Sequence, residues 1–341
     1  MRALALTGPG RSELQEVADP EPGPDDVVVD VARVGICGTD AELFSGEMEY
    51  LRQGHSSYPL TPGHEWCGTV TAVGANVPQD WVDRRVTGDT MLGCGACRRC
   101  RQRRHHVCEN RSEIGIRGSY PGALAEKLRV PASALLGLPD DVDDTAGAMV
   151  EPGGNALRAV QAAAVTSGER LLVVGTGTIG LLAAQFASAD GVRVHLAGVA
   201  GPGLEFARES GFGETSTLVD LPDVPFDAVI DASNAHAVPA QVVRLVEPGR
   251  RVVFIGLAAE PSLVDSREIA LRDVTAVGIL GASAGLPGTI SAYASGAVDP
   301  RPLVAAVVGL DQAHDALSGW RPDDATSAPK IHVDPRHQEM R

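Results

Sequence analysis

The sequence predicts a two-domain α/β protein, in which a mostly β domain is joined to a doubly wound parallel sheet with helices on both faces. Three observations predict it. The first 138 residues consist mainly of short β-branched or alternating apolar runs with little helical spacing. From residue 170 onwards, apolar strands alternate with helical stretches, the pattern of a parallel sheet. At 341 residues, 44% of them apolar, the chain is long enough to bury two cores.

The first part of the chain is expected to consist of strands separated by turns. A cluster of prolines and glycine at 20–24 is a strong turn signal. The segment between Cys37 and Gly63 is expected to be a polar loop. The expected strands are Leu4–Leu6, Leu14–Val17, Val27–Val31, Gly68–Val73, Arg85–Thr90 and a return to strand within 121–138.

The second part is expected to alternate strand and helix. A long helix is expected from Val142 to Ala164, running past Glu151. The chain returns to β structure at 301–310 and 330–333, and a loose tail is expected from Pro335. The alternating strands are Arg170–Val174, Val192–Ala197, Phe226–Asp231, Arg251–Gly256 and Thr275–Leu280, and the helices are 178–188, Leu204–Ser210, Val238–Val246 and Gly285–Ser295.

Composition restricts the function classes. A formal net charge of −15 argues against a general binder of nucleic acid or anionic membrane. The N-terminus lacks an export signal, and no apolar stretch is long enough to span a bilayer, so a soluble cytoplasmic protein is expected. The acidic balance has one local exception, the arginine cluster within 98–104, which is expected to be a solvated face. A zinc protein that binds nucleic acid through this cluster stays open as an alternative of a different class, which salt-dependent DNA binding would support.

Four of the six cysteines have the spacing of a metal site. Two residues lie between the first and second cysteines and two between the second and third, and seven residues lie between the third and fourth. Four thiolates can close a tetrahedral zinc shell and hold together a short segment that has almost no apolar residues of its own. Because a closed shell has no open position, we assign this site to stability; disulfides or a redox pair are the alternatives. The four are Cys94, Cys97, Cys100 and Cys108.

A second group of residue types matches a catalytic zinc. Cys37 offers a thiolate, His64 an imidazole and Glu65 a carboxylate, and Glu151 is a candidate fourth group. Protein ligands of a catalytic zinc leave one position open for substrate or water. Taken alone, Cys37 and His64 would be read as ordinary core residues, and the rest of the chain favours the metal site.

A glycine-rich turn predicts a nucleotide site. Gly175, Gly177 and Gly180 follow an apolar strand and open a helix, with Thr176, Thr178 and Ile179 between them. This context favours pyrophosphate binding at the helix N-terminus over a purely structural turn. The acidic residue expected at the end of the second strand is replaced by Gly198. A 2′-phosphate would therefore not be repelled, and the absence of a carboxylate slightly favours NADP over NAD as the cofactor.

Five motifs occur in a fixed order over nearly the whole chain. They are Gly35-Ile-Cys-Gly-Thr-Asp40, Pro62-Gly-His-Glu65, the four-cysteine segment, Glu151-Pro and the turn at 175–180. Together they resemble the zinc-dependent medium-chain dehydrogenase/reductase superfamily, in the branch of sorbitol, threonine and glucose dehydrogenases. The resemblance implies a GroES-like catalytic domain over 1–152 with a zinc lobe at about 91–112, a Rossmann domain over 153–285, and a return to the catalytic domain over 286–341.

The resemblance also implies roles for single residues. Cys37, His64 and Glu65 correspond to catalytic zinc ligands, and Glu151 to a carboxylate that binds zinc directly or through water. Whether Glu65 or Glu151 is the resting ligand stays open. Thr39 resembles the hydroxyl that receives the substrate proton.

Two positions differ between branches of the superfamily. Many relatives place a histidine five residues after the ligand cysteine, where this chain has Glu42. That carboxylate would either accept the proton or bind a sugar hydroxyl. Asn155 resembles the threonine dehydrogenase version of its helix, so the motifs do not fix the branch.

The implied reaction is oxidation of a secondary alcohol, or reduction of the ketone, with NAD(P). Zinc would acidify the alcohol, Thr39 would take its proton towards Glu42, and hydride would pass to the nicotinamide. A polyol, cyclitol or sugar is the expected substrate, and an amino alcohol such as threonine is the runner-up. A non-catalytic relative is the alternative of another class. The resemblance also implies a homodimer or homotetramer, with Asp273–Leu280 as the strand that pairs across subunits.

Overall fold

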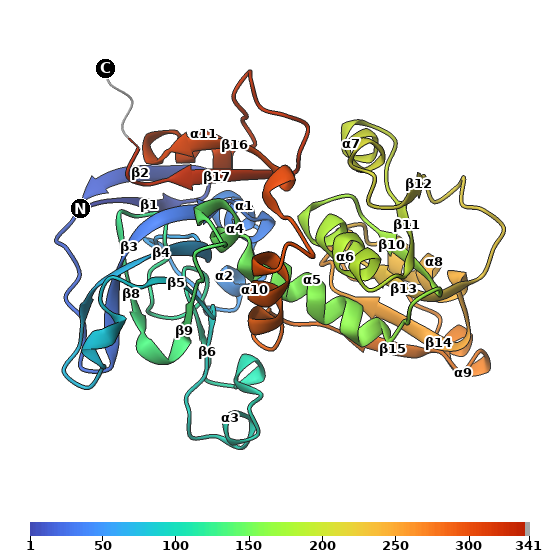
Figure 1. Ribbon diagram of the computed structural model, residues 1–341, viewed down its shortest axis with the longest axis horizontal. Coiled ribbons are helices and arrows are strands. Elements are labelled where there is room, and N and C mark those ends of the chain that lie inside the picture. The colour runs from blue at the N-terminus through green and yellow to red at the C-terminus, as the bar shows by residue number, and fades with distance from the viewer. Residues whose placement is uncertain (338–341) are drawn as a thin grey trace. The chain divides into compact units, whose positions relative to one another are not determined.

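The computed structural model describes residues 1–337, which form two compact units (Figure 1). Unit 1 comprises Met1–Glu151, Val304–Thr326 and the segment that begins at Lys330, and unit 2 comprises Pro152–Leu303 and Ser327–Pro329. We expected the return to the first domain at residue 286, and it comes at Val304. Helix α10 remains with unit 2 because Tyr293 stacks on Phe186 of helix α6, with ring centroids 6.2 Å apart.

Unit 1 is built mainly from strands, as predicted. Its seven-stranded sheet has the order β16-β17-β3-β4-β5-β9, and β8 also pairs with β3. β3 is almost wholly buried, which fits its valine-rich sequence. The strands are β1 Arg2–Gly8, β2 Arg11–Glu16, β3 Asp26–Gly35, β4 Glu65–Val73, β5 Arg85–Gly88, β6 Met91–Leu92, β7 Ser112–Glu113, β8 Lys127–Pro131, β9 Leu135–Gly137, β16 Val304–Gly309 and β17 Lys330–Asp334.

The loop expected between Cys37 and Gly63 is wrong in part, because it contains two helices. In α1, Asp40 accepts a hydrogen bond from the Cys37 N–H at 2.9 Å, Leu43 and Phe44 are buried, and Gly46 ends the helix with φ of 87°. The helices of unit 1 are α1 Gly38–Ser45, α2 Glu49–Arg52, α3 Arg98–Arg101, α4 Asp144–Ala148 and α11 Ala313–Leu317, with short 3₁₀ turns at Gln79–Trp81, His105–Val107, Ala132–Ala134 and Leu310–Gln312.

The single helix expected over 142–164 is also wrong, because the chain forms two. Asp143 caps α4, which ends at Ala148, and a new helix α5 spans Val150–Ala163. The break places Pro152 in the first turn of α5, the part of a helix where a missing backbone N–H costs nothing.

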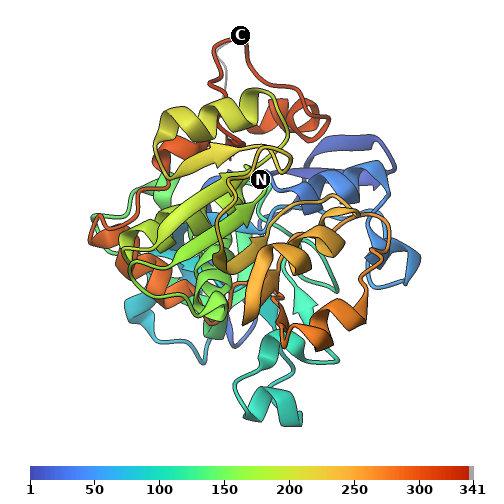
Figure 2. The ribbon, with the colours of Figure 1, turned by 90° about the vertical axis from the view of Figure 1, so that its right-hand side faces the viewer.

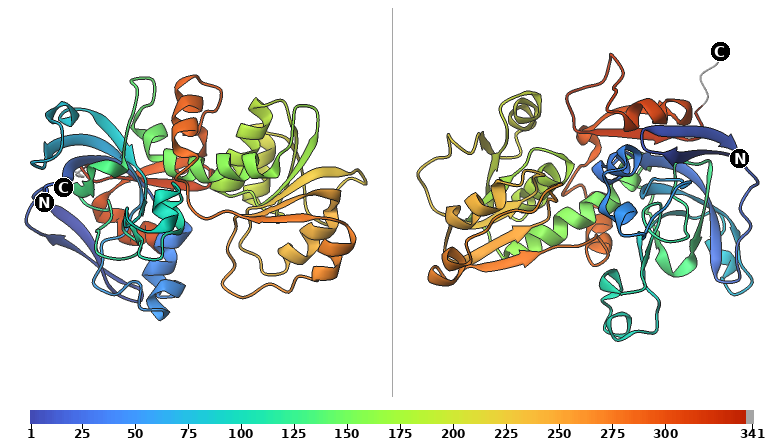
Figure 3. Two further views of the ribbon diagram at one scale, coloured as in Figure 1. Left: turned by 90° about the horizontal axis from the view of Figure 1, so that it is seen from below. Right: turned by 180° about the vertical axis from the view of Figure 1, so that it is seen from behind.

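Unit 2 holds a six-stranded parallel sheet in the order β12-β11-β10-β13-β14-β15, with helices on both faces (Figures 2 and 3). This is the doubly wound arrangement that binds dinucleotides. Two short elements, β12 and α9, were not predicted. The strands are β10 Arg170–Val174, β11 Arg193–Ala197, β12 Glu214–Ser216, β13 Phe226–Asp231, β14 Val246–Phe254 and β15 Thr275–Gly278; the helices are α6 Thr178–Ala189, α7 Pro202–Ser210, α8 Val238–Leu245, α9 Ser266–Leu271 and α10 Leu286–Ala294, with a 3₁₀ turn at Arg301–Leu303.

The chain end is only partly a loose tail. Arg336 contacts the carboxylates of Asp334 and Asp144, and residues 338–341 of the expected tail lie outside the described residues. Within residues 1–337, no helix combines the length and the apolar character needed to cross a membrane.

Candidate metal and cofactor sites

Cys37, His64 and Glu65 come together in unit 1, with their ligand atoms within 4.8 Å of one another. Cys37 follows β3, and Glu65 begins β4 opposite Gly35 of β3. A Cβ atom at Gly35 would lie 2.2 Å from Glu65 Oε2, so only glycine leaves room for this carboxylate. The antiparallel register of β3 and β4 therefore assembles the three groups.

Asp40 holds His64 in place. This fully buried carboxylate accepts hydrogen bonds from the N–H groups of Cys37, at 2.9 Å, and Gly63, at 3.0 Å. Its Oδ1 lies 3.3 Å from His64 Nδ1, an ion-pair distance without hydrogen-bond geometry. Burial raises the pKa of Asp40, but His64 and the two N–H groups outweigh it and lower the pKa overall. With Nδ1 facing Asp40, Nε2 is the imidazole nitrogen left for a metal.

Lys330 compensates the charge of Glu65. Its Nζ lies 2.8 Å from Oε1 and 2.7 Å from Oε2 of Glu65, and it also donates to the carbonyl of Ile36 at 3.0 Å. The lysine side chain is 4% exposed and that of the glutamate 1%. Burial lowers the pKa of Lys330, but Glu65 and Cys37 outweigh it and raise the pKa. The lysine thus places a positive charge against a carboxylate that is otherwise isolated in the interior.

Sequence reasoning missed both Asp40 and Lys330. Asp40 belongs to the motif that carries Cys37, so its position pointed to a role. Lys330 is one of only two lysines in the chain and lies in an apolar strand, which is a weaker signal. Its partner is 265 residues away in the sequence.

Thr39 and Glu42 lie three residues apart on α1, so their side chains are neighbours on the helix surface. Partial burial and the nearby Glu47 raise the pKa of Glu42. Glu151 is buried at the start of α5. Among residues 1–337, the donors that lie within 4.8 Å of one another at this site do not include Glu151.

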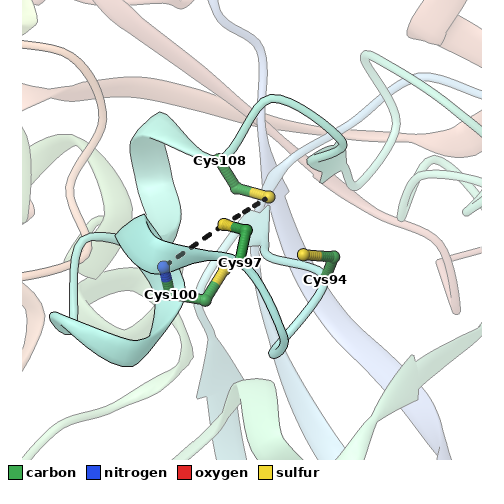
Figure 4. Close-up of side chains that lie close together, drawn as sticks. All are labelled: Cys94, Cys97, Cys100 and Cys108. Carbon is green, nitrogen blue, oxygen red and sulfur yellow. Dashed lines mark hydrogen bonds between the residues drawn. The ribbon is translucent and has the colours of Figure 1, made fainter.

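The four predicted cysteines form a second group of donors. All four sulfurs lie within 4.8 Å of one another, and Cys97 Sγ is 3.7 Å from Cys108 Sγ (Figure 4). The backbone N–H groups of Ala96 and Cys97 lower the pKa of Cys94 to about 6, whereas desolvation raises the pKa of Cys100 to about 12, so the four thiols differ in acidity. The segment projects from the sheet around α3 (Figure 3, right). These donors fit a closed tetrahedral metal site.

All six cysteines are free thiols. Cys67, the sixth, is fully buried; burial raises its pKa, and its Sγ donates to the carbonyl of Asp144 at 3.1 Å. It is an inert core residue.

The glycine turn in unit 2 is shaped for a ligand. Gly175 has φ of 114°, and a Cβ atom added there would lie 2.7 Å from the carbonyl oxygen of Ala232. A Cβ atom added at Gly180 would lie 1.9 Å from the carbonyl oxygen of Gly175. At Gly177, the N-cap residue of α6, a Cβ atom would meet nothing within 4 Å. Two glycines therefore serve internal packing and the third leaves open space beside the helix N-terminus, which fits a pyrophosphate. Thr176, Thr178 and Ile179 occupy the remaining positions of the turn.

Gly198 lies directly after β11, where an acidic residue would bind an adenosine ribose. A Cβ atom there would lie 2.8 Å from the methyl group and 3.0 Å from the hydroxyl of Thr176. The threonine side chain thus fills the space that a larger residue at 198 would need, and this end of the turn carries no charge from either residue.

Comparisons with known proteins agree with this architecture. Residues 23–140 match the alcohol dehydrogenase GroES-like domain. An L-threonine 3-dehydrogenase from Saccharopolyspora erythraea is 35% identical over 294 residues, which cover 82% of this chain and 84% of the relative. A zinc-binding dehydrogenase from Sinorhizobium meliloti 1021 solved with NADP is 29% identical with a TM-score of 0.88, covering 98% of this chain and 99% of that one. An alcohol dehydrogenase from E. coli CFT073 solved with NADH is 26% identical with the same TM-score and coverage.

The fold, the motif order and the 35% identity lead to one family. The chain belongs to the zinc-dependent medium-chain dehydrogenase/reductase superfamily, as an NAD(P)-dependent oxidoreductase of the kind that acts on the CH–OH group of alcohols.

Proposed function

We propose that this protein oxidises a secondary alcohol of a polyol, cyclitol or sugar, or reduces the corresponding ketone, with a nicotinamide cofactor. The observation that supports this most is the group of a thiol, an imidazole and a carboxylate within 4.8 Å, supplied by Cys37, His64 and Glu65. It has an open-site ligand set and stands apart from the closed four-cysteine group.

The donor groups assign two metal ions to different tasks. Cys37, His64 and Glu65 would hold a catalytic zinc, with Glu151 as a further carboxylate near the start of α5, and the four cysteines of the lobe would hold a structural zinc. When bound, the catalytic zinc acts as a Lewis acid that makes an alcohol more acidic, and the nicotinamide accepts hydride.

The chain's own residues orient the reactants and move the proton. Asp40 fixes the imidazole of His64, and Gly35 leaves the space in which the Glu65 carboxylate sits. The hydroxyl of Thr39 takes the substrate proton, and the carboxylate of Glu42, whose pKa is raised, receives it at its oxygen.

A second candidate is an amino alcohol such as threonine. The 35% identity to an L-threonine 3-dehydrogenase favours it, and Asn155 agrees with that branch. The polar character of the segment between Cys37 and Gly63 favours the polyol. Polyols and amino alcohols differ in charge, so an assay with both classes of substrate distinguishes the two candidate functions.

The cofactor and the assembly follow from unit 2. Gly198 places no carboxylate against a 2′-phosphate, so we propose NADP as the better cofactor.

β15 is the edge strand of its sheet, and Leu271, which is 85% exposed, lies just before it. An unpaired edge of this kind can pair with a second copy, so we propose a homodimer or a dimer of dimers.

A substrate panel tests the proposal. Zinc-loaded protein would be offered polyols, sugars, aminocyclitols and amino alcohols, each with NAD and with NADP, and nicotinamide absorbance followed. Turnover of a polyol, cyclitol or sugar supports the proposal, and turnover of amino alcohols alone supports the second candidate. No turnover, together with no zinc bound at Cys37, would point to a non-catalytic relative.

A further inference from the structure

A cavity of about 440 Å³ in unit 1 is distinct from the metal donors, none of which lines it. Two loops form its walls, 54–61 after α2 and 115–121 after β7, and β1 and β2 contribute Ala5 and Gln15. Hydrogen bonds join the loops. The Gly118 N–H donates to the His55 carbonyl at 3.2 Å, and the Gly122 N–H donates to the Thr61 carbonyl at 2.7 Å. The cavity is therefore built by paired segments.

The charge of this cavity is opposite to that of the chain. The protein carries a formal net charge of −15. Yet none of the lining residues, all of them within residues 1–337, is Asp or Glu. The basic side chains that line it are Arg117 and His55, and the other lining residues include several hydroxyls, that of Tyr120 among them. No carboxylate in the described part of the chain forms an ion pair with Arg117, so its charge is available to a ligand.

Tyr50 holds both of these groups. Its ring lies 5.4 Å from the Arg117 guanidinium and 5.8 Å, edge to face, from the His55 ring. Its hydroxyl donates to Glu113 Oε1 at 3.2 Å and accepts from Arg111 at 2.8 Å. Arg111 and Glu113 themselves pair at 2.7 Å, with side chains 14% and 3% exposed. A buried ion pair thus fixes the tyrosine, and the tyrosine fixes the cation.

We propose that this cavity binds an anionic group, a phosphate or a carboxylate, through Arg117, His55 and the hydroxyls around them. Arginine forms charge-assisted hydrogen bonds with such anions in paired geometry, and hydroxyls complete their coordination. The group is either the distal end of the alcohol substrate or a separate small anion. Loop 54–61 leads directly to the motif that carries His64, so one wall of the cavity and a metal donor belong to one continuous segment.

Inorganic phosphate is the probe. It would be titrated calorimetrically into zinc-loaded protein with saturating NADP, so that the pyrophosphate-binding turn is occupied. Arg117→Gln should weaken phosphate binding about tenfold or more. Ser119→Asp, which replaces a hydroxyl with a negative charge at an exposed lining position, should also weaken it. Arg98→Gln, the same charge change on the exposed four-cysteine segment, should have no effect.

Two results would overturn the proposal: no saturable binding of phosphate by the wild type, or equal loss in Arg117→Gln and Arg98→Gln. The titration needs no turnover, so its failure is distinct from a failure of the proposed dehydrogenase activity.

Kinetic measurements then distinguish the two sources of the anion, the substrate itself and a separate ligand. If Arg117→Gln raises KM for a polyol monophosphate and not for the free polyol, the anion belongs to the substrate. If phosphate changes kcat for the free polyol, and does so only when Arg117 is present, the anion is a separate ligand.

Discussion

Lys330→Met should destabilise the metal-free protein strongly, because it leaves the Glu65 carboxylate buried without a counter-charge. The two side chains are 4% and 1% exposed, and both carboxylate oxygens lie within 2.8 Å of the lysine. Removing one partner of such a pair costs about 3–5 kcal/mol. For a unit of this size, that loss lowers the Tm by about 6–20 °C. Urea denaturation and calorimetry of the metal-free protein measure both quantities.

The other lysine provides a matched control on the same sheet. Lys127 of β8 pairs with Asp19 at 3.1 Å and Asp30 at 3.5 Å, but its side chain is 31% exposed. Lys127→Met should therefore cost only about 0–1 kcal/mol. Equal costs for the two lysine variants would refute the reasoning.

Two further measurements locate the cause in Glu65. Adding Glu65→Gln to Lys330→Met removes the isolated charge and should recover part of the lost stability. Zinc loading should also reduce the cost of Lys330→Met, because the metal supplies a positive charge beside Glu65. If neither change recovers stability, the lysine acts through packing and not through charge.

Three further outcomes are expected. Glu47→Gln removes a like charge near Glu42 and so lowers the pKa of Glu42, which should move the acidic limb of the pH–rate profile to lower pH; an unmoved limb would separate Glu42 from the proton path. Ala276→Lys on β15 should reduce the oligomer seen by analytical ultracentrifugation, whereas Thr215→Lys on the opposite edge strand should not. kcat/KM should be larger for NADP than for NAD, because Gly198 supplies no carboxylate, and a larger value for NAD would contradict this.

Local patterns predicted most of the fold. Arg170–Val174 and the helix from 178 came directly from an apolar run, a glycine turn and a helical stretch. The helix α1 was missed because glycine, threonine and aspartate fill its first turn, and these are common in loops. Its stability comes from the Asp40 cap and from burial of Leu43 and Phe44, which only tertiary structure reveals.

The donor residues of the site were predictable and their supporting residues were not. Cys37, His64 and Glu65 lie in short motifs whose spacing reflects one pair of adjacent strands. The Lys330–Glu65 pair depends on β17 lying beside β3, a pairing of distant segments with no local signal. Glu151 stays a prediction, because its motif suggests a ligand and the donors within 4.8 Å of one another in residues 1–337 do not include it.

The most direct test of the central claim is the zinc content of the wild type and of Cys37→Ser, measured together with turnover. We expect two zinc ions per chain in the wild type, one for each donor group. Cys37→Ser should retain one zinc, the native fold and cofactor binding, and lose turnover. A variant that keeps both zinc ions, or that turns over substrate at the native rate, would contradict the assignment of Cys37 to a catalytic metal.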